Sequence, residues 1–146
     1  MSDMRVLGLD VGERRIGVAL SDPLGLSAQR LTVLERAGDR ADVDVVCALI
    51  DKHSVSCVVV GLPLTLRGTH GPQAQRVTSF VQALRRHSPV PVELVDERLT
   101  TVQGERTLLE TNTSRRRRKQ VIDQVAAQLI LQHYLETHRQ RENATE

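Results

Sequence analysis

Aromatic residues are almost absent from this chain of 146 residues, which has one phenylalanine, one tyrosine and no tryptophan. Proteins that bind single-stranded nucleic acid commonly stack the bases on aromatic side chains. Phe80 and Tyr134 offer little for building such a surface. We therefore expect any bound nucleic acid to be held through its backbone and shape rather than through stacked bases.

Cysteines and long apolar runs are also scarce. Cys47 and Cys57 form no CxxC pair and lie in no histidine cluster, which argues against a disulfide framework or a zinc site. We expect both to be small buried residues in a reducing compartment. No apolar run approaches the roughly 20 residues that cross a bilayer. The N-terminus shows no signal peptide, so we expect a cytoplasmic protein without a membrane partner.

The net charge is only +2, but positive charge is concentrated in one segment. Residues 98–119 carry seven basic and two acidic side chains, a local excess of five positive charges. The densest part is the run Arg115, Arg116, Arg117, Arg118 and Lys119. A solvated loop is one interpretation of this run, and a surface that attracts phosphate groups is the other. If these five charges each neutralise one phosphate, log affinity falls with log salt at a slope of about −4.5.

The spacing of apolar residues predicts three strands, then a helix, a strand, a helix, a strand and two final helices. This order predicts an α/β fold with a mixed five-stranded sheet, in which an antiparallel hairpin region continues into parallel strands with helices on the faces. We expect one domain over residues 1–138 and a polar tail over 139–146. The expected strands span 4–9, 16–20, 29–35, 56–60 and 92–95, and the expected helices span 42–52, 72–84, 100–109 and 116–138.

Three acidic residues are candidates for chemistry because of where this fold would place them. Asp10 closes the first strand, and Glu97 follows the last one. The carboxyl ends of parallel strands meet at one edge of a sheet, and Asp123, near the start of the last helix, can lean over that edge. Carboxylates gathered in this way repel one another unless a cation is bound, and oxygen ligands favour Mg²⁺ or Mn²⁺. Each acid taken alone could equally be a turn residue or a surface residue.

Several ordered motifs resemble those of the YqgF family, also called RuvX, whose members are Holliday-junction-resolvase-like proteins of the ribonuclease H-like superfamily. The matching blocks cover nearly the whole chain, and they are GLDVG at 8–12 with RIGVA at 15–19, VGLPL at 60–64, DERLTT at 96–101, and Asp123 with AA at 126–127 and ILQ at 130–132.

The resemblance implies a ribonuclease H-like fold and a metal-dependent nuclease that matures the 5′ end of the precursor of 16S ribosomal RNA. It also implies that Asp10, Glu97 and Asp123 bind the metal, with Asp96 the less certain acid of its pair. Arg98 and Thr100 would support the site or contact phosphate. The chain departs from the family at Arg67, where relatives usually carry Asp. It also departs from RuvC-type resolvases, which carry a fourth acid where Ala126 and Ala127 stand here.

Other functions remain open at this point. Within the nuclease hypothesis, the substrate could be structured RNA or branched DNA, and the protein could be a monomer or a homodimer; a resolvase would act as a symmetric dimer. A non-catalytic factor in transcription or ribosome assembly is another possibility. A third is a phosphate-binding fragment related to actin-like ATPases and sugar kinases, which need two lobes where this chain supplies one.

Overall fold

The computed structural model describes residues 5–63, 71–97 and 125–138. Seven elements lie in the first two ranges, and residues 125–138 form a further helix. The elements are β1 (Val6–Val11), β2 (Arg15–Ser21), β3 (Ala28–Glu35), α1 (Asp39–His53), β4 (Cys57–Leu62), α2 (Pro72–His87) and β5 (Val92–Asp96). The predicted order of elements is confirmed over these ranges. The expected helix at 100–109 and the start of the one at 116–138 lie outside the described residues.

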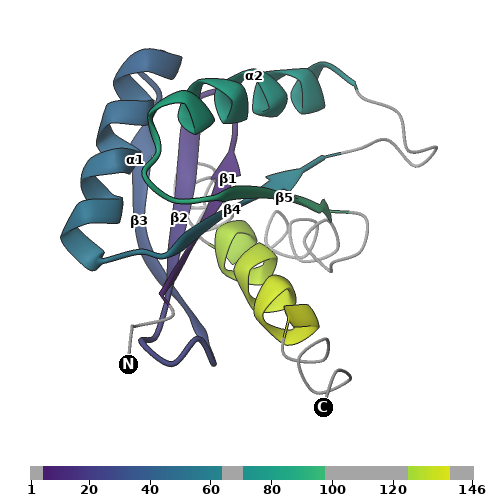
Figure 1. Cartoon of the computed structure of the whole chain (residues 1–146). Coiled ribbons are helices and arrows are strands. Elements are labelled where there is room, and N and C mark those ends of the chain that lie inside the picture. The colour runs from purple at the N-terminus through teal and green to yellow at the C-terminus, as the bar shows by residue number, and fades with distance from the viewer. Residues whose placement is uncertain (1–4, 64–70, 98–124, 139–146) are drawn as a thin grey trace, which may run out of the picture.

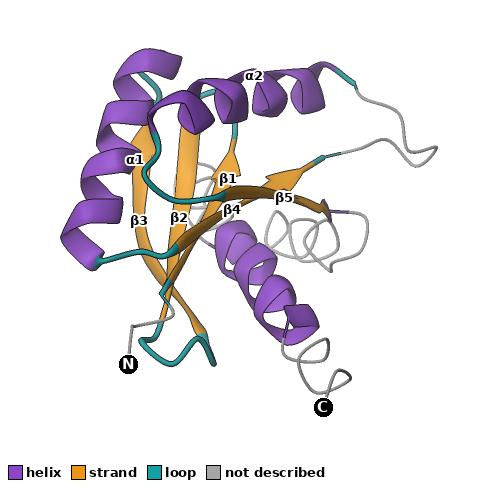
Figure 2. Ribbon diagram, viewed as in Figure 1, coloured by secondary structure: helices purple, strands orange, loops and turns teal. Residues whose placement is uncertain are grey.

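The five strands form one mixed sheet in the order β3-β2-β1-β4-β5 (Figure 2). β1 pairs antiparallel with β2, and β2 pairs antiparallel with β3. β1 also pairs parallel with β4, and β4 pairs parallel with β5. The predicted sheet, an antiparallel region continued by parallel strands, is therefore confirmed. β1 is its central strand, which explains why all six of its residues are buried.

Two strands extend further than the sequence predicts, and both extensions carry site residues. β1 continues to Val11, so Asp10 lies inside the strand, paired with Gly17 of β2, rather than closing it. β4 continues through Gly61 and Leu62, because these residues pair with Val95 and Asp96 of β5. The expected strand at 56–60 stops before Gly61 because glycine has a low preference for strands, but pairing with β5 overrides that local preference.

Helices cover both faces of the sheet (Figure 1). On one face, α1 and α2 pack on alternate strand residues such as Leu9, Val18 and Val60, which form one hydrophobic cluster with Phe80 of α2. On the other face lies the helix of residues 125–138, whose Ala127, Ile130 and Leu131 join a second cluster. Alternation of side chains along each strand therefore assigns every core residue of β1 and β4 to one of two layers.

The cysteines are less buried than predicted. Cys47 and Cys57 are free thiols with intermediate exposure, not fully buried residues. Cys47 lies on α1 near its partly exposed side, and Cys57 is the first residue of β4, so neither occupies the centre of a cluster. Burial is still the main cause that raises the pKa of both thiols. Neither thiol is therefore activated as a nucleophile.

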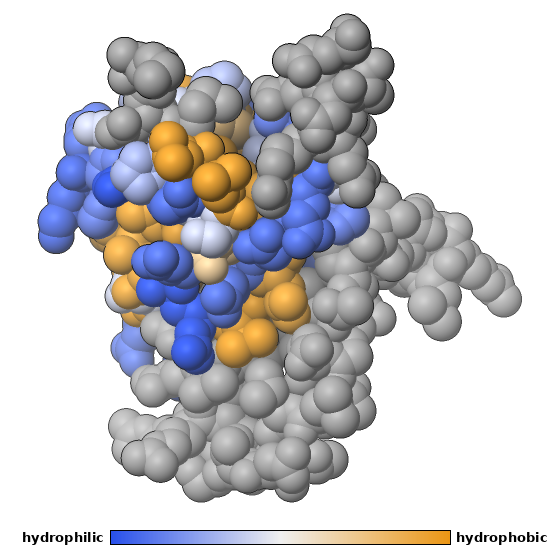
Figure 3. All heavy atoms as spheres, turned by 90° about the horizontal axis from the view of Figure 1, so that it is seen from below, coloured by the Kyte–Doolittle hydropathy of each residue, from blue (hydrophilic) through white to orange (hydrophobic). Residues whose placement is uncertain are grey.

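The exposed large hydrophobic side chains are spread over three parts of the fold. Leu24 and Leu26 lie in the turn between β2 and β3, Val45 lies on α1 and Leu94 on β5. In the view from below, hydrophobic atoms of the described residues form several separate groups between hydrophilic ones (Figure 3). Scattered exposure of this kind is normal for a protein surface. None of the helices within the described ranges is both long and apolar enough to cross a membrane.

Candidate active site

The candidate site lies at the edge of the sheet where β1, β4 and β5 all end. These three strands are parallel, so Val11, Leu62 and Asp96 finish at the same edge. Asp10 lies one residue before the end of β1, and Glu97 directly follows β5. The structure thus places two of the three predicted acids at one edge, as expected for strands that run in the same direction.

Strand register places Asp10 and Glu97 on the same face of the sheet. Leu9 is paired with Val60, so Asp10 lies level with Gly61, and Gly61 is paired with Val95. Partners in a parallel sheet face the same side, and side chains two residues apart along a strand do as well. Glu97, two residues after Val95, therefore returns to the face of Asp10. This is the face covered by the helix of residues 125–138, since Val95 packs in that cluster.

The same alternation separates the two neighbouring acids at the end of β5. Asp96 is paired with Leu62, whose side chain belongs to the cluster beneath α1 and α2. Asp96 therefore faces away from Asp10, whereas Glu97 faces the same way as Asp10. Asp96 is also only half-buried, and Glu97 is 2% exposed. The geometry favours Glu97 over Asp96 as the acid that acts together with Asp10.

Gly61 makes room for the carboxylate of Glu97 between the two strands. A Cβ atom on Gly61 would lie 2.7 Å from Oε1 of Glu97 and 2.4 Å from Cδ1 of Ile130. The Glu97 side chain therefore lies over the backbone of β4, which is the strand between β5 and the Asp10-bearing strand β1. A glycine within a run of valines marks such a close approach. The sequence indicated the motif that contains Gly61, but not that Gly61 makes room for the side chain of Glu97.

Both acids are buried and both form interactions. Asp10 is 5% exposed and Glu97 is 2% exposed. Burying two carboxylates at one edge is costly unless hydrogen bonds or a cation compensate their charge. Oxygen-only ligands of this kind fit Mg²⁺ or Mn²⁺ rather than zinc.

The remaining predicted site residues lie outside the described residues. Within the described residues, no group of three or more His, Cys, Asp and Glu side chains could hold a metal. Asp123, which would be the third carboxylate, lies outside the described residues. The same holds for Arg67, Arg98, Thr100 and the basic run Arg115, Arg116, Arg117, Arg118 and Lys119.

The described part of the final helix, residues 125–138, passes over Gly61 next to the candidate site and runs away from it. Ile130 lies over Gly61, level with Asp10, whereas Tyr134 lies near Cys57, where β4 begins, at 3.9 Å between the hydroxyl and Sγ. Two hydrogen bonds fasten the helix to β3. Gln128 donates to the carbonyl of Ala28 at 3.0 Å, and Gln132 accepts from the amide of Ala28 at 3.0 Å. Both bonds join the helix to one residue at the start of β3. Because Ile130 lies over Gly61 and Tyr134 lies near Cys57, the N-terminal side of the described helix is the side toward the site edge.

Arg36 links the turn after Asp10 to the helical layer. Its guanidinium donates to the carbonyl of Gly12 at 3.1 Å and to the carboxylate of Asp42 at 2.8 Å, and it forms an ion pair with Asp39. The guanidinium also lies 5.5 Å from the centre of the Phe80 ring. The Gly12 amide closes the same turn by donating to the carbonyl of Arg15 at 2.8 Å.

Arg36 was not singled out from the sequence. The two ion pairs did have a signal in the sequence, because Arg36 stands just before a helix whose first turn carries Asp39 and Asp42. No sequence pattern indicated the bond to Gly12. The network holds in place the turn that begins two residues after Asp10.

Comparison with known proteins gives a consistent result. A family model described as "RuvX: Holliday junction resolvase" matches residues 4–137. The chain is 44% identical over 134 residues to a Clostridium botulinum protein named "Putative pre-16S rRNA nuclease", covering 92% of this chain and 98% of that protein. A Clostridium kluyveri protein of the same name is 45% identical over 133 residues, covering 91% and 97%.

Two solved structures share the fold. RuvC of Thermus thermophilus, in complex with a Holliday junction substrate, aligns with a TM-score of 0.59 at 16% identity, covering 93% of this chain and 96% of that one. The Fowlpox virus resolvase, in complex with Holliday junction DNA, aligns with a TM-score of 0.51 at 10% identity, covering 92% and 98%. At these identities the alignments establish the fold alone.

Proposed function

The chain belongs to the RuvX family of Holliday junction resolvases, and from this premise we propose that it is a metal-dependent endonuclease that matures the 5′ end of the precursor of 16S ribosomal RNA in the cytoplasm. The two relatives at 44% and 45% identity, which carry the name of that activity, support the choice of substrate. The observation that carries the proposal is the pair of buried carboxylates, Asp10 and Glu97, on one face of the sheet edge. Strand register sets this arrangement, because Asp10 lies level with Gly61 and Val95, and Glu97 follows Val95 by two residues.

In this proposal Asp10, Glu97 and Asp123 hold the metal ion. The donor set fits Mg²⁺ or Mn²⁺ because it consists of carboxylate oxygens, and Gly61 leaves the space that the Glu97 carboxylate occupies. Such an ion, when bound, polarises the scissile phosphate, activates water and stabilises the leaving oxygen. The chain itself supplies rigidity. β1 and β4 hold Asp10 and Gly61 level with each other, and Ile130 packs over Gly61 beside Glu97.

Asp123 is the third ligand of the proposed site. The helix that begins at residue 125 within the described part of the chain has its N-terminal end toward the site edge. Asp123 precedes that point by two residues. Arg98 and Thr100 follow Glu97 closely in the sequence, and we assign them to contacts with the phosphate at the cleaved bond. The basic run from Arg115 to Lys119 would hold the backbone of the substrate.

Branched DNA is the second candidate substrate, supported by the RuvC-like fold. The last helix counts against it. Ala126 and Ala127 are 1% and 0% exposed and belong to the cluster beneath this helix. They stand where RuvC-type resolvases carry a fourth acid, so the chain lacks that carboxylate. We therefore favour structured RNA over a four-way junction.

The test compares the wild-type protein with Asp10→Asn on two labelled substrates, a precursor ribosomal RNA fragment and a four-way DNA junction. Each is incubated with Mg²⁺, Mn²⁺ or EDTA. Asp51→Asn, an exposed acid on α1, is the matched control for the loss of one carboxylate. We expect RNA cleavage that requires metal, disappears in Asp10→Asn and persists in Asp51→Asn. Symmetric cleavage of the junction alone would replace this function with that of a resolvase. Binding without cleavage of either substrate would favour a non-catalytic factor.

A further inference from the structure

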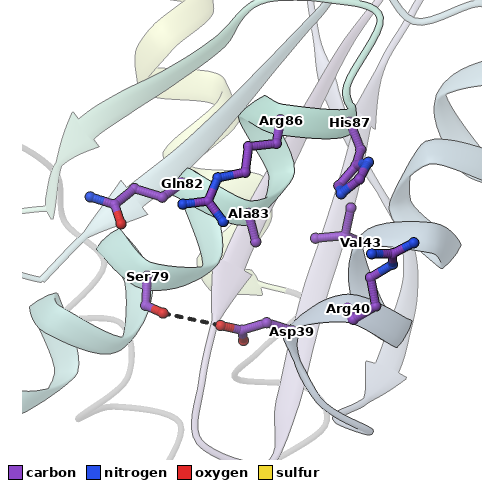
Figure 4. A pocket seen from close by; sticks show the side chains of 8 residues that line it. All are labelled: Asp39, Arg40, Val43, Ser79, Gln82, Ala83, Arg86 and His87. Atoms are coloured by element: carbon purple, nitrogen blue, oxygen red, sulfur yellow. Dashed lines mark hydrogen bonds between the residues drawn. The ribbon is translucent and has the colours of Figure 1, made fainter.

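A second basic surface lies between α1 and α2, on the face of the sheet opposite the carboxylate pair. The two helices enclose a hollow of about 350 Å³. Val43 and Ala83 face each other across its base, and the side chains of Arg40, Arg86 and His87 surround it (Figure 4). Three basic side chains from two helices therefore gather around one hollow.

The single acid that lines this hollow, Asp39, is already neutralised. One of its carboxylate oxygens forms an ion pair with Arg36, and the other accepts a hydrogen bond from the Ser79 hydroxyl at 3.1 Å (Figure 4). Arg40 and Arg86 differ in this respect. Within the described part of the chain, both ion pairs are formed by Arg36, and neither Arg40 nor Arg86 takes part in one.

Asp44, one turn along α1 from Arg40, forms no ion pair with it, and the two acids closer in sequence, Asp39 and Asp42, are both paired with Arg36. Both arginines are exposed to solvent. Their charges are therefore available to an anion at the hollow. Gln82 adds a carboxamide that can donate hydrogen bonds to the same place.

We propose that the hollow between α1 and α2 binds the phosphate backbone of the nucleic-acid substrate, as a contact separate from the cleavage edge. Guanidinium groups match phosphate oxygens through paired N–H donors, which makes arginine well suited to this role. The near absence of aromatic residues also favours a protein that holds its substrate through phosphates. The inference rests on the proposed function, because it takes the substrate to be a nucleic acid.

Arg36 connects the hollow to the turn beside the candidate site. Asp39 begins α1 and lines the hollow, and its ion-pair partner Arg36 donates to the carbonyl of Gly12, in the turn that follows Asp10. α1 therefore starts at the same end of the sheet as the carboxylate pair. A duplex that passes from the site edge onto the helical layer would come to Arg40, which lies in the first turn of α1.

The test measures binding of the full chain to the precursor ribosomal RNA fragment and to the four-way DNA junction over a range of salt concentrations. All proteins carry Asp10→Asn, so that no substrate is cut. Arg40→Gln with Arg86→Gln removes the two charges at the hollow. Arg30→Gln with Lys52→Gln removes two exposed charges elsewhere, on β3 and at the end of α1, as the matched control.

Loss of two phosphate contacts should make the slope of log affinity against log salt shallower by about 1.8 on duplex, or about 1.4 on single strands. Compared with the protein that carries Asp10→Asn alone, the Arg40/Arg86 variant should bind at least about tenfold more weakly at 50 mM salt. This difference in affinity should shrink by about tenfold between 50 and 200 mM salt. The control pair should leave the slope unchanged. A loss confined to RNA, or to the junction, identifies which nucleic acid uses the hollow.

Equal slopes in the two double variants would overturn the proposal. So would a lower melting temperature of the Arg40/Arg86 variant with unchanged binding, because Arg86 would then serve the stability of the last turn of α2. Binding is measured without cleavage. Failure of the nuclease function therefore leaves this result interpretable, and a shallower slope would stand even if the wild-type protein cuts neither substrate.

Discussion

Replacing Gly61 by alanine tests whether the space above β4 positions Glu97. The new Cβ would lie 2.4 Å from Cδ1 and 3.1 Å from Cγ1 of Ile130, and 2.7 Å from Oε1 of Glu97. Non-bonded atoms do not approach this closely, so either the buried Ile130, the Glu97 carboxylate or both must move. Overpacking of this kind costs about 1–3 kcal/mol of unfolding free energy. If Glu97 holds the metal as proposed, displacing its carboxylate by about 1 Å should reduce cleavage by about a hundredfold.

Gly8→Ala is the matched control because it crowds the same helix without touching Glu97. A Cβ on Gly8 would lie 2.8 Å from Cβ of Leu131 and 3.1 Å from the Ala127 carbonyl. We expect a similar loss of stability, about 1–3 kcal/mol in urea unfolding, because the side chain is again inserted into a packed layer. Metal-dependent cleavage, corrected for the fraction folded, should fall much less than in Gly61→Ala.

The double variant Gly61→Ala with Ile130→Val separates the two effects further. Valine lacks the Cδ1 atom that makes the closest contact, so the double variant should recover part of the lost stability. The contact with Glu97 Oε1 remains, so cleavage and Mn²⁺ binding by calorimetry should stay impaired. The reasoning would be refuted if Gly61→Ala cleaved and bound Mn²⁺ like the wild-type protein, or if Gly8→Ala lost activity to the same extent.

Two further predictions concern the rest of the fold. Arg36→Ala removes the guanidinium that lies 2.8 Å from the carboxylate of Asp42, which is 3% exposed. Urea unfolding should show that the free energy of unfolding falls by about 3–5 kcal/mol, against almost no change for Arg40→Ala. A fall of less than about 1 kcal/mol would contradict the ion-pair account. The pKa of Asp22 lies below its ordinary value of 3.8, because the amide of Ser27, and after it those of Leu26 and Leu24, donate to its carboxylate. The stabilisation by Asp22 is therefore complete above pH 3.8 and is lost as the pH falls through the lowered pKa of Asp22 in the folded protein. An NMR titration that gives the Asp22 carboxyl a pKa of 3.8 or higher would disprove this.

Features that depend on local pattern could be predicted from the sequence. Apolar periodicity predicted every strand and helix of the described ranges, and parallel strand ends placed Asp10 and Glu97 at one edge. The choice between Asp96 and Glu97 required the register of β5 against β4, which pairs Asp96 with Leu62 and cannot be obtained from either strand alone.

Features that depend on contacts between distant segments were missed. The bond from Arg36 to Gly12 joins residues 24 positions apart. The space above Gly61 matters only because Ile130 and Glu97 approach it from elsewhere in the chain. The partial exposure of the cysteines likewise follows from where α1 and β4 lie in the assembled fold.

The position of the helix at residues 125–138 determines when the candidate site can be completed during synthesis of the chain. Synthesis proceeds from the N-terminus, and β1, β2 and β3 pair with neighbours close in the chain, so this half of the sheet can form early. Glu97, and after it the helix of residues 125–138 that covers Gly8 and Gly61, are made later than these strands. Until that helix has been made, the candidate site lacks the layer that packs over Gly61 beside Glu97.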